Sequence, residues 1–111
     1  MIIGLLEMGK RKVLTEKDLK NTPLPGPGQL LGIAKKMLGN DRAMVLCTDR
    51  NVRNCRIKGK LRRRVWIRQG DAVLVELLGF QDEGRGEIVG RYVASQRGWL
   101  MKNGYIPDWM F

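Results

Sequence analysis

Polar and apolar residues alternate over short stretches in the middle of the chain, which is typical of β-strands with one buried face. The clearest case is residues 42–48, where Ala43, Val45 and Cys47 share one face and the intervening residues share the other. A second stretch, residues 52–58, has two faces that differ in character. One face holds Arg53, Cys55 and Ile57, and the other holds Val52, Asn54, Arg56 and Lys58.

The same reasoning predicts five strands, at about residues 30–38, 42–48, 52–58, 72–80 and 87–93, separated by turns rich in Gly, Asn and Asp. In the fifth strand, Ile88, Gly90 and Tyr92 are expected on one face. Residues 60–67 are typical of a short helical or 3-10 turn, with Leu61, Val65 and Trp66 as candidates to face inward. Five short strands with one such turn between the third and the fourth predict an all-β fold, a closed barrel of the OB-fold type.

The ends of the chain differ from this middle region. Residues 1–28 lack a clear period and end in a run of Pro and Gly, so we expect a flexible basic arm before a barrel at residues 29–93. Residues 94–111 carry a helical spacing, and a helix is predicted at about 95–103, with Ser95 as its cap and Gly104 as its stop. The remaining apolar end either packs on the barrel or binds a partner protein, and we expect it to pack. Its members are Tyr105, Ile106, Trp109 and Phe111.

Composition excludes several kinds of chemistry. The 111 residues include no His, which excludes histidine bases and mixed Cys/His zinc sites, and two cysteines, Cys47 and Cys55, are too few for a four-ligand metal site. We therefore expect no cofactor or metal, and we read the cysteines as small buried side chains in a reducing cytoplasm. Asp82 and Glu83 could form a catalytic pair, but adjacent acids in a Gly-flanked loop usually face solvent. The chain has no predicted membrane span.

Charge is concentrated in residues 53–68. This basic block has eight cations and no acid, so it accounts for +8 of the net charge of +10. Such density predicts a polyanionic partner, above all nucleic acid, although a solvated face without a partner is the alternative. The predicted RNA-binding cations of the block are Arg53, Arg56, Lys58, Lys60, Arg62, Arg63, Arg64 and Arg68. The acids gather outside it, at Asp71, Glu76, Asp82, Glu83 and Glu87.

Three further residues are candidates for the same site. Trp66 lies inside the block and either stacks on a base or covers the end of the barrel. Asn40 and Arg42 could reach the same ligand from the first hairpin turn, or they belong to an ordinary Gly-Asn-Asp turn.

An ordered series of motifs resembles one family. KMLGN at residues 36–40, RIKGKLRRRVWI at 56–67, GD at 70–71 and FQDE at 80–83 are similar to translation initiation factor 1A of archaea and eukaryotes, and more distantly to bacterial translation initiation factor 1. The resemblance implies an S1-like OB-fold that binds the decoding A site of the small ribosomal subunit through 16S-type rRNA. It also implies work with other initiation factors, including the GTPase initiation factor 5B, in loading initiator tRNA and mRNA.

The resemblance carries over to particular positions. The rRNA-facing residues would be Asn40, Arg42, Arg56, Lys58, Lys60, Arg62, Arg63, Arg64 and Trp66. The long acidic tail of the eukaryotic members is not seen, which favours an archaeal type. The start MIIGLLEM differs from the basic arm of the family, so we expect translation to begin downstream of Met1.

Three functions are therefore compared. The first is a non-enzymatic, monomeric initiation factor that binds rRNA. The second is a general single-strand RNA-binding module of the cold-shock or S1 type, which would rely on several exposed aromatic residues. The third is a ribonuclease, for which the chain offers no histidine and no convincing acid cluster.

Overall fold

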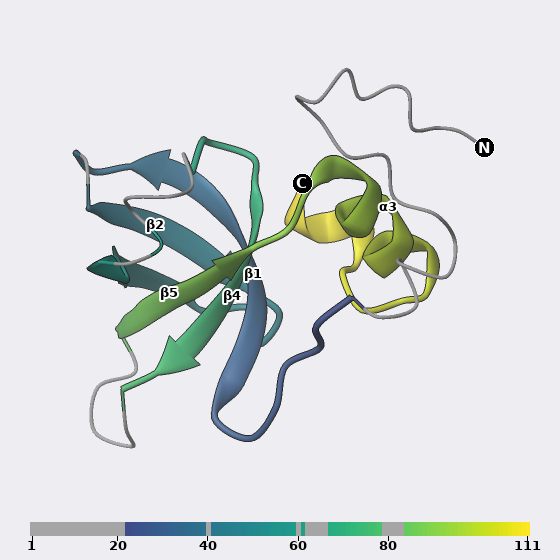
Figure 1. Ribbon diagram of the computed structural model, residues 1–111, viewed down its shortest axis with the longest axis horizontal. Coiled ribbons are helices and arrows are strands. Elements are labelled where there is room, and N and C mark those ends of the chain that lie inside the picture. The colour runs from purple at the N-terminus through teal and green to yellow at the C-terminus, as the bar shows by residue number, and fades with distance from the viewer. Residues whose placement is uncertain (1–21, 40, 60, 62–66, 79–83) are drawn as a thin grey trace.

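Five strands form a closed barrel, and a helical segment lies at one side of it (Figure 1). The computed structural model describes residues 22–39, 41–59, 61, 67–78 and 84–111. The elements are β1 (Gln29–Met37), β2 (Arg42–Cys47), β3 (Val52–Ile57), β4 (Ala72–Leu77), β5 (Arg85–Arg91), helix α3 (Ala94–Lys102) and the 3-10 helix η2 (Asp108–Met110). The order around the barrel is β1-β2-β3-β5-β4, and β4 pairs again with β1. Among the strands of the described residues, only β3 and β5 pair in parallel. These features confirm the predicted OB-fold class.

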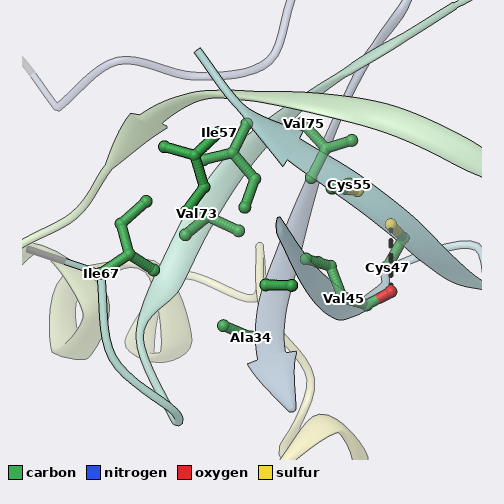
Figure 2. Close-up of a cluster of buried hydrophobic side chains, with 10 residues drawn as sticks. Ala34, Val45, Cys47, Cys55, Ile57, Ile67, Val73 and Val75 are labelled. Carbon is green, nitrogen blue, oxygen red and sulfur yellow. Dashed lines mark hydrogen bonds between the residues drawn. The ribbon is translucent and has the colours of Figure 1, made fainter. Parts of the chain in front are cut away.

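The inside of the barrel is filled by one cluster of small and branched side chains, which we call the barrel core (Figure 2). As predicted, the alternating residues of β2 point inward, and both cysteines are fully buried. Leu61 packs against the same cluster, whereas Val65 and Trp66 lie outside the described residues, as does most of the predicted turn at 60–67. The barrel core consists of Ala34, Ala43, Val45, Cys47, Cys55, Ile57, Ile67, Val73, Val75 and Ile88.

Two register shifts change which face a residue occupies. Between β4 and β5 the pairing moves from Val75 opposite Ile88 to Leu74 opposite Gly90, so β5 carries one extra residue. Such a bulge exchanges the two faces of a strand. Ile88 therefore lies in the barrel core while Tyr92 lies outside the barrel, and the prediction that they share a face was wrong. A similar shift occurs in β1 after Ala34.

A second cluster joins the outside of the barrel to the C-terminal segment. This outer cluster consists of Leu31, Ile33, Ala72, Tyr92, Leu100, Ile106 and Met110. Burial of a large apolar side chain contributes about 1.5–3 kcal/mol, so the burial of Leu100, Ile106 and Met110 helps to hold the segment on the barrel. The expected packing of the apolar end is confirmed for Ile106, but Tyr105, Trp109 and Phe111 remain exposed.

The ends of several elements differ from prediction. β4 ends at Leu77, and Leu78 is already outside the strand and exposed; residues 79 and 80 lie outside the described part. α3 begins at Ala94, so Ser95 is not its cap; instead the Val93 N–H donates to Gln96 Oε1 at 3.0 Å.

Gly104 stops α3 as predicted. It has a φ of +82°, a conformation that favours glycine. The Gly104 N–H donates to Met101 O and the Tyr105 N–H to Leu100 O, which together form a Schellman motif. This turn directs the chain back toward the barrel, where Ile106 and Met110 are buried.

The chain before β1 is hydrogen bonded to Tyr92. The Tyr92 hydroxyl donates to Pro23 O at 2.6 Å, and Thr22 is buried. The arm predicted for residues 1–28 lies mostly outside the described residues, as does the possible helical turn near Thr15. The division of the chain into arm, barrel and C-terminal segment stays a prediction.

Candidate nucleic-acid interface

The structure places four of the predicted RNA-binding cations on the surface. Arg42 lies at the start of β2, Arg56 lies near the end of β3, Lys58 directly follows β3, and Arg68 lies four residues before β4. All four residues are exposed. Six other predicted residues lie outside the described part of the chain. They are Asn40, Lys60, Arg62, Arg63, Arg64 and Trp66.

Arg42 and Arg56 are brought together by the pairing of β2 with β3. They are direct partners in the register, and the Ile57 N–H donates to Asp41 O at 2.7 Å beside them. This bond shows that the two arginines form a non-hydrogen-bonded pair, the kind in which facing side chains are closest. Within the described residues neither arginine makes an ion pair. Glu87 neighbours Arg56 on β5 without an ion pair between them, so the two facing cations still repel each other, and this position favours an external anion.

Charge changes sign around the outside of the barrel. In the strand registers Arg42 faces Arg56, Arg56 neighbours Glu87, and Glu87 faces Glu76. One row of outward positions therefore passes from two cations on β2 and β3 to two acids on β5 and β4. A polyanion would be attracted to the β2–β3 side and repelled by the β4–β5 side.

Arg53 does not belong to this exposed surface. Its side chain is only 4% exposed, and its two terminal nitrogens donate to the two carboxylate oxygens of Asp49 at 2.9 and 2.8 Å. These hydrogen bonds hold the pKa of Asp49 at about 2 and raise the pKa of Arg53 above its usual value. The position does not favour a contact with RNA. The burial of Arg53 was indicated by the sequence, because Arg53 shares its face of the strand with Cys55 and Ile57, which are buried.

The turn between β2 and β3 contacts the C-terminal segment, which the sequence did not predict. Arg50 has a φ of +71°, a conformation that costs a residue with a side chain roughly 1–2 kcal/mol. Its guanidinium lies 4.3 Å from the centre of the Trp109 ring. A cation–π contact of this kind contributes about 0.5–1 kcal/mol at an exposed site. The energy cost of the left-handed backbone and the energy gained from the cation–π contact are therefore of similar size.

Other aromatic residues of the C-terminal segment are also paired. Trp99 and Tyr105 stack with their ring centres 5.8 Å apart. The Arg97 guanidinium lies 5.7 Å from the centre of the Phe111 ring, and it also donates to Gly70 O at 3.0 Å. Among the described residues, the exposed rings thus gather on the C-terminal segment and not on the outer face of β2 and β3.

Both cysteines and the acid Asp71 take part in the packing or local contacts of the fold. Burial raises the pKa of the Cys47 thiol, and it raises that of Cys55 to about 12, so both thiols stay protonated at neutral pH. No group of three His, Cys, Asp or Glu side chains in this part of the chain could hold a metal ion. Asp71 is engaged locally, because it accepts a hydrogen bond from the Arg68 N–H and pairs with Arg91. No helix within the described ranges is long and apolar enough to cross a membrane.

The closed barrel defines the chain as an OB-fold domain, a class that binds oligonucleotides through strands 2 and 3 and the adjoining loops. Arg42 and Arg56 lie on those two strands. Residues 19–110 match the family described as Translation initiation factor 1A / IF-1. The chain is 46% identical to translation initiation factor 1A of Methanopyrus kandleri over 101 residues, which cover 91% of this chain and 88% of the relative.

Two further relatives agree. The chain is 45% identical to translation initiation factor 1A of Pyrococcus abyssi over 99 residues, which cover 89% of this chain and 87% of the relative. It is also 45% identical to the factor of Picrophilus torridus over 87 residues, which cover 78% and 80% of the two chains. The chain belongs to the translation initiation factor 1A family and has a role in translation initiation.

Proposed function

We propose that this chain binds the small ribosomal subunit near the decoding A site through 16S-type rRNA and supports the loading of initiator tRNA and mRNA. The observation that carries the proposal is the facing pair of Arg42 and Arg56 on the strands that OB-fold domains use for nucleic acid. In this proposal the chain acts by binding and not by catalysis, as a monomer, in the cytoplasm, together with other initiation factors that include initiation factor 5B.

The chemistry of the pair suits phosphate. A guanidinium is planar and can donate two parallel hydrogen bonds to a phosphate group, whereas a lysine offers a point charge. Arg42, Arg56, Lys58 and Arg68 form the described part of the proposed surface. Asn40, Lys60, Arg62, Arg63, Arg64 and Trp66 remain predicted members of it, and Arg53 is left out because Asp49 already binds its guanidinium.

The structure favours folded RNA over arbitrary single strands as the ligand. Proteins that bind single strands without sequence preference stack bases on aromatic side chains of the sheet. The outward positions of β2 and β3 hold no aromatic residue: they are Arg42, Met44, Leu46, Val52, Asn54 and Arg56. Binding to phosphates held in a fixed arrangement fits this surface better.

Sedimentation with purified small subunits tests the proposal. We expect the chain to sediment with the subunits, and we expect a variant with Arg62, Arg63 and Arg64 changed to Glu to remain in the supernatant. Lys102→Glu, at the exposed end of α3, serves as the control for one charge reversal away from the surface. Normal binding by the triple variant would show that the site is wrongly assigned, and equal affinity for arbitrary single-stranded RNA and for subunits would favour a general RNA-binding module.

A further inference from the structure

The turn between β2 and β3 is built around one carboxylate. Asp49 accepts hydrogen bonds from the Asn51 N–H and the Asn51 amide, both at 3.1 Å, and from both terminal nitrogens of Arg53. The backbone closes the same turn, because the Arg50 N–H donates to Cys47 O at 2.9 Å. Arg50 is therefore fixed in its left-handed conformation by contacts on both sides of it.

This conformation points Arg50 at the C-terminal segment. Its guanidinium lies over the ring of Trp109, a partly exposed residue whose neighbour Met110 is fully buried in the outer cluster. The contact therefore joins a tight turn of the barrel to η2. Arg50 and Trp109 lie 59 positions apart in the sequence, so no local propensity produces this contact.

Arg53 supports the turn from inside the protein. It lies on the same strand as the exposed Arg56, three residues away, but on the opposite face. Its guanidinium binds both oxygens of Asp49 and so fixes the plane of that carboxylate, which in turn binds Asn51. Arg53 reaches Trp109 only through Asp49 and Arg50.

We propose that the Arg50–Trp109 contact holds the end of the C-terminal segment on the barrel, and that Arg53 is the positioning residue that sets this contact through Asp49. The basic block then has two kinds of arginine. Arg56 faces solvent, whereas Arg53 is internal and controls where η2 and its exposed rings lie. This inference does not depend on the proposed function, because it concerns the free protein.

Fluorine NMR of the full chain labelled with 5-fluorotryptophan tests the contact. The chain has three tryptophans, and Trp109→Phe identifies the resonance of Trp109. Arg50→Gly is the informative variant, because glycine accepts the φ of +71° and keeps the turn while the guanidinium is lost. We expect the Trp109 resonance to move and that of Trp99 to stay.

Hydrogen exchange gives a second measure. The amides of Met110 and Phe111 donate to Pro107 O and Asp108 O. Loss of one exposed cation–π contact should raise their exchange rates roughly twofold to fivefold.

The role of Arg53 is tested by a matched pair of variants on β3. Arg53→Met should move the Trp109 resonance in the same direction as Arg50→Gly, and Arg53→Lys should move it less. Arg56→Met removes the same charge from the same strand and should leave the resonance unchanged. If Arg53→Met does not fold, Asp49→Asn takes its place.

Two results would overturn the proposal. A Trp109 resonance that is the same in Arg50→Gly as in the unchanged protein would show that the contact does not hold the segment. A resonance that moves in Arg50→Gly but not in Arg53→Met, or in Asp49→Asn where that variant is used, would show that Arg53 does not position it.

Discussion

Arg42 and Arg56 face each other across β2 and β3 in a non-hydrogen-bonded pair, and within the described residues neither makes an ion pair with an acid. Like charges in this position destabilise a sheet, by up to about 1 kcal/mol in typical cross-strand pairs. A cost of this kind is expected where the pair binds an anion from outside.

The first prediction follows from this pair. Arg42→Ala should leave the protein as stable as before or raise its free energy of unfolding by a few tenths of a kcal/mol at low salt, because one repulsive contact is lost. RNA binding should weaken in the same variant, and the slope of log K against log salt should become shallower by roughly one unit. Urea unfolding and filter binding at several salt concentrations measure the two effects. Lys102→Ala is the matched control and should change neither slope nor affinity.

The second prediction concerns space inside the barrel. A Cβ added at Gly32 would collide with Val45 Cγ1 and approach the backbone O of Leu46 to 3.1 Å. Gly32→Ala should therefore lower the free energy of unfolding by about 1–3 kcal/mol. Gly98→Ala is the control, since nothing lies near that position of α3 and alanine favours a helix by roughly 1 kcal/mol over glycine. Urea unfolding that showed equal stability for the two variants would contradict the close approach of β1 and β2.

Much of the barrel is predictable from the sequence because alternation along a strand is a local property. β2 and the inward face of β3 follow from it directly. The faces of Ile88 and Tyr92 do not, because the bulge between them arises from the pairing of β5 with β4 and leaves no mark in the local pattern. The exposed cations Arg42 and Arg56 were predicted as separate candidates, but their pairing across β2 and β3 depends on the register of the two strands.

The count of cations in the basic block does not separate the buried Arg53 from the exposed arginines. The basic block was treated as a single surface, although Arg53 shares its strand face with the buried Cys55. An acid four residues before it, Asp49, was available as a partner across the turn. The contact of Arg50 with Trp109 had no signal in the sequence, since it joins segments that only the packing of the outer cluster brings together.

The third prediction is a loss of stability in acid. The pKa of Asp49 is about 2 in the folded protein and 3.8 without its partners, so the pair with Arg53 stabilises the fold fully above about pH 4 and loses this effect as the pH falls toward 2. Because the carboxylate is about a third exposed, solvent screening limits the effect to roughly 1 kcal/mol. The stability difference between the unchanged protein and Asp49→Asn should shrink by this amount between pH 5 and pH 2. Chemical unfolding at each pH measures it, and a constant difference would contradict the pairing.

The fourth prediction concerns the attachment of the chain before β1. Tyr92→Phe removes the hydrogen bond to Pro23 O and should lower the free energy of unfolding by about 1 kcal/mol at neutral pH. Burial raises the pKa of Tyr92 from 10 to about 12, so the unfolded chain loses this proton first and stability falls as the pH rises from 10 to 12. The Tyr92→Phe variant has no hydroxyl proton to lose, so its stability does not fall with pH for this reason. Unfolding experiments on both proteins at pH 8 and pH 11 should show the gap between them narrowing, and a gap that widens would contradict a buried hydroxyl.

In the proposed function, the face formed by β2 and β3 binds rRNA in the decoding region of the small subunit. Chemical footprinting of 16S-type rRNA in purified small subunits tests it directly, with the unchanged chain, the double variant Arg42→Glu/Arg56→Glu and the control Lys102→Glu. We expect protected nucleotides that cluster around the A site. This protection should be present with the unchanged chain and with the control, and it should be lost with the double variant. Protection elsewhere on the subunit, or protection at the A site that survives the double variant, would contradict it.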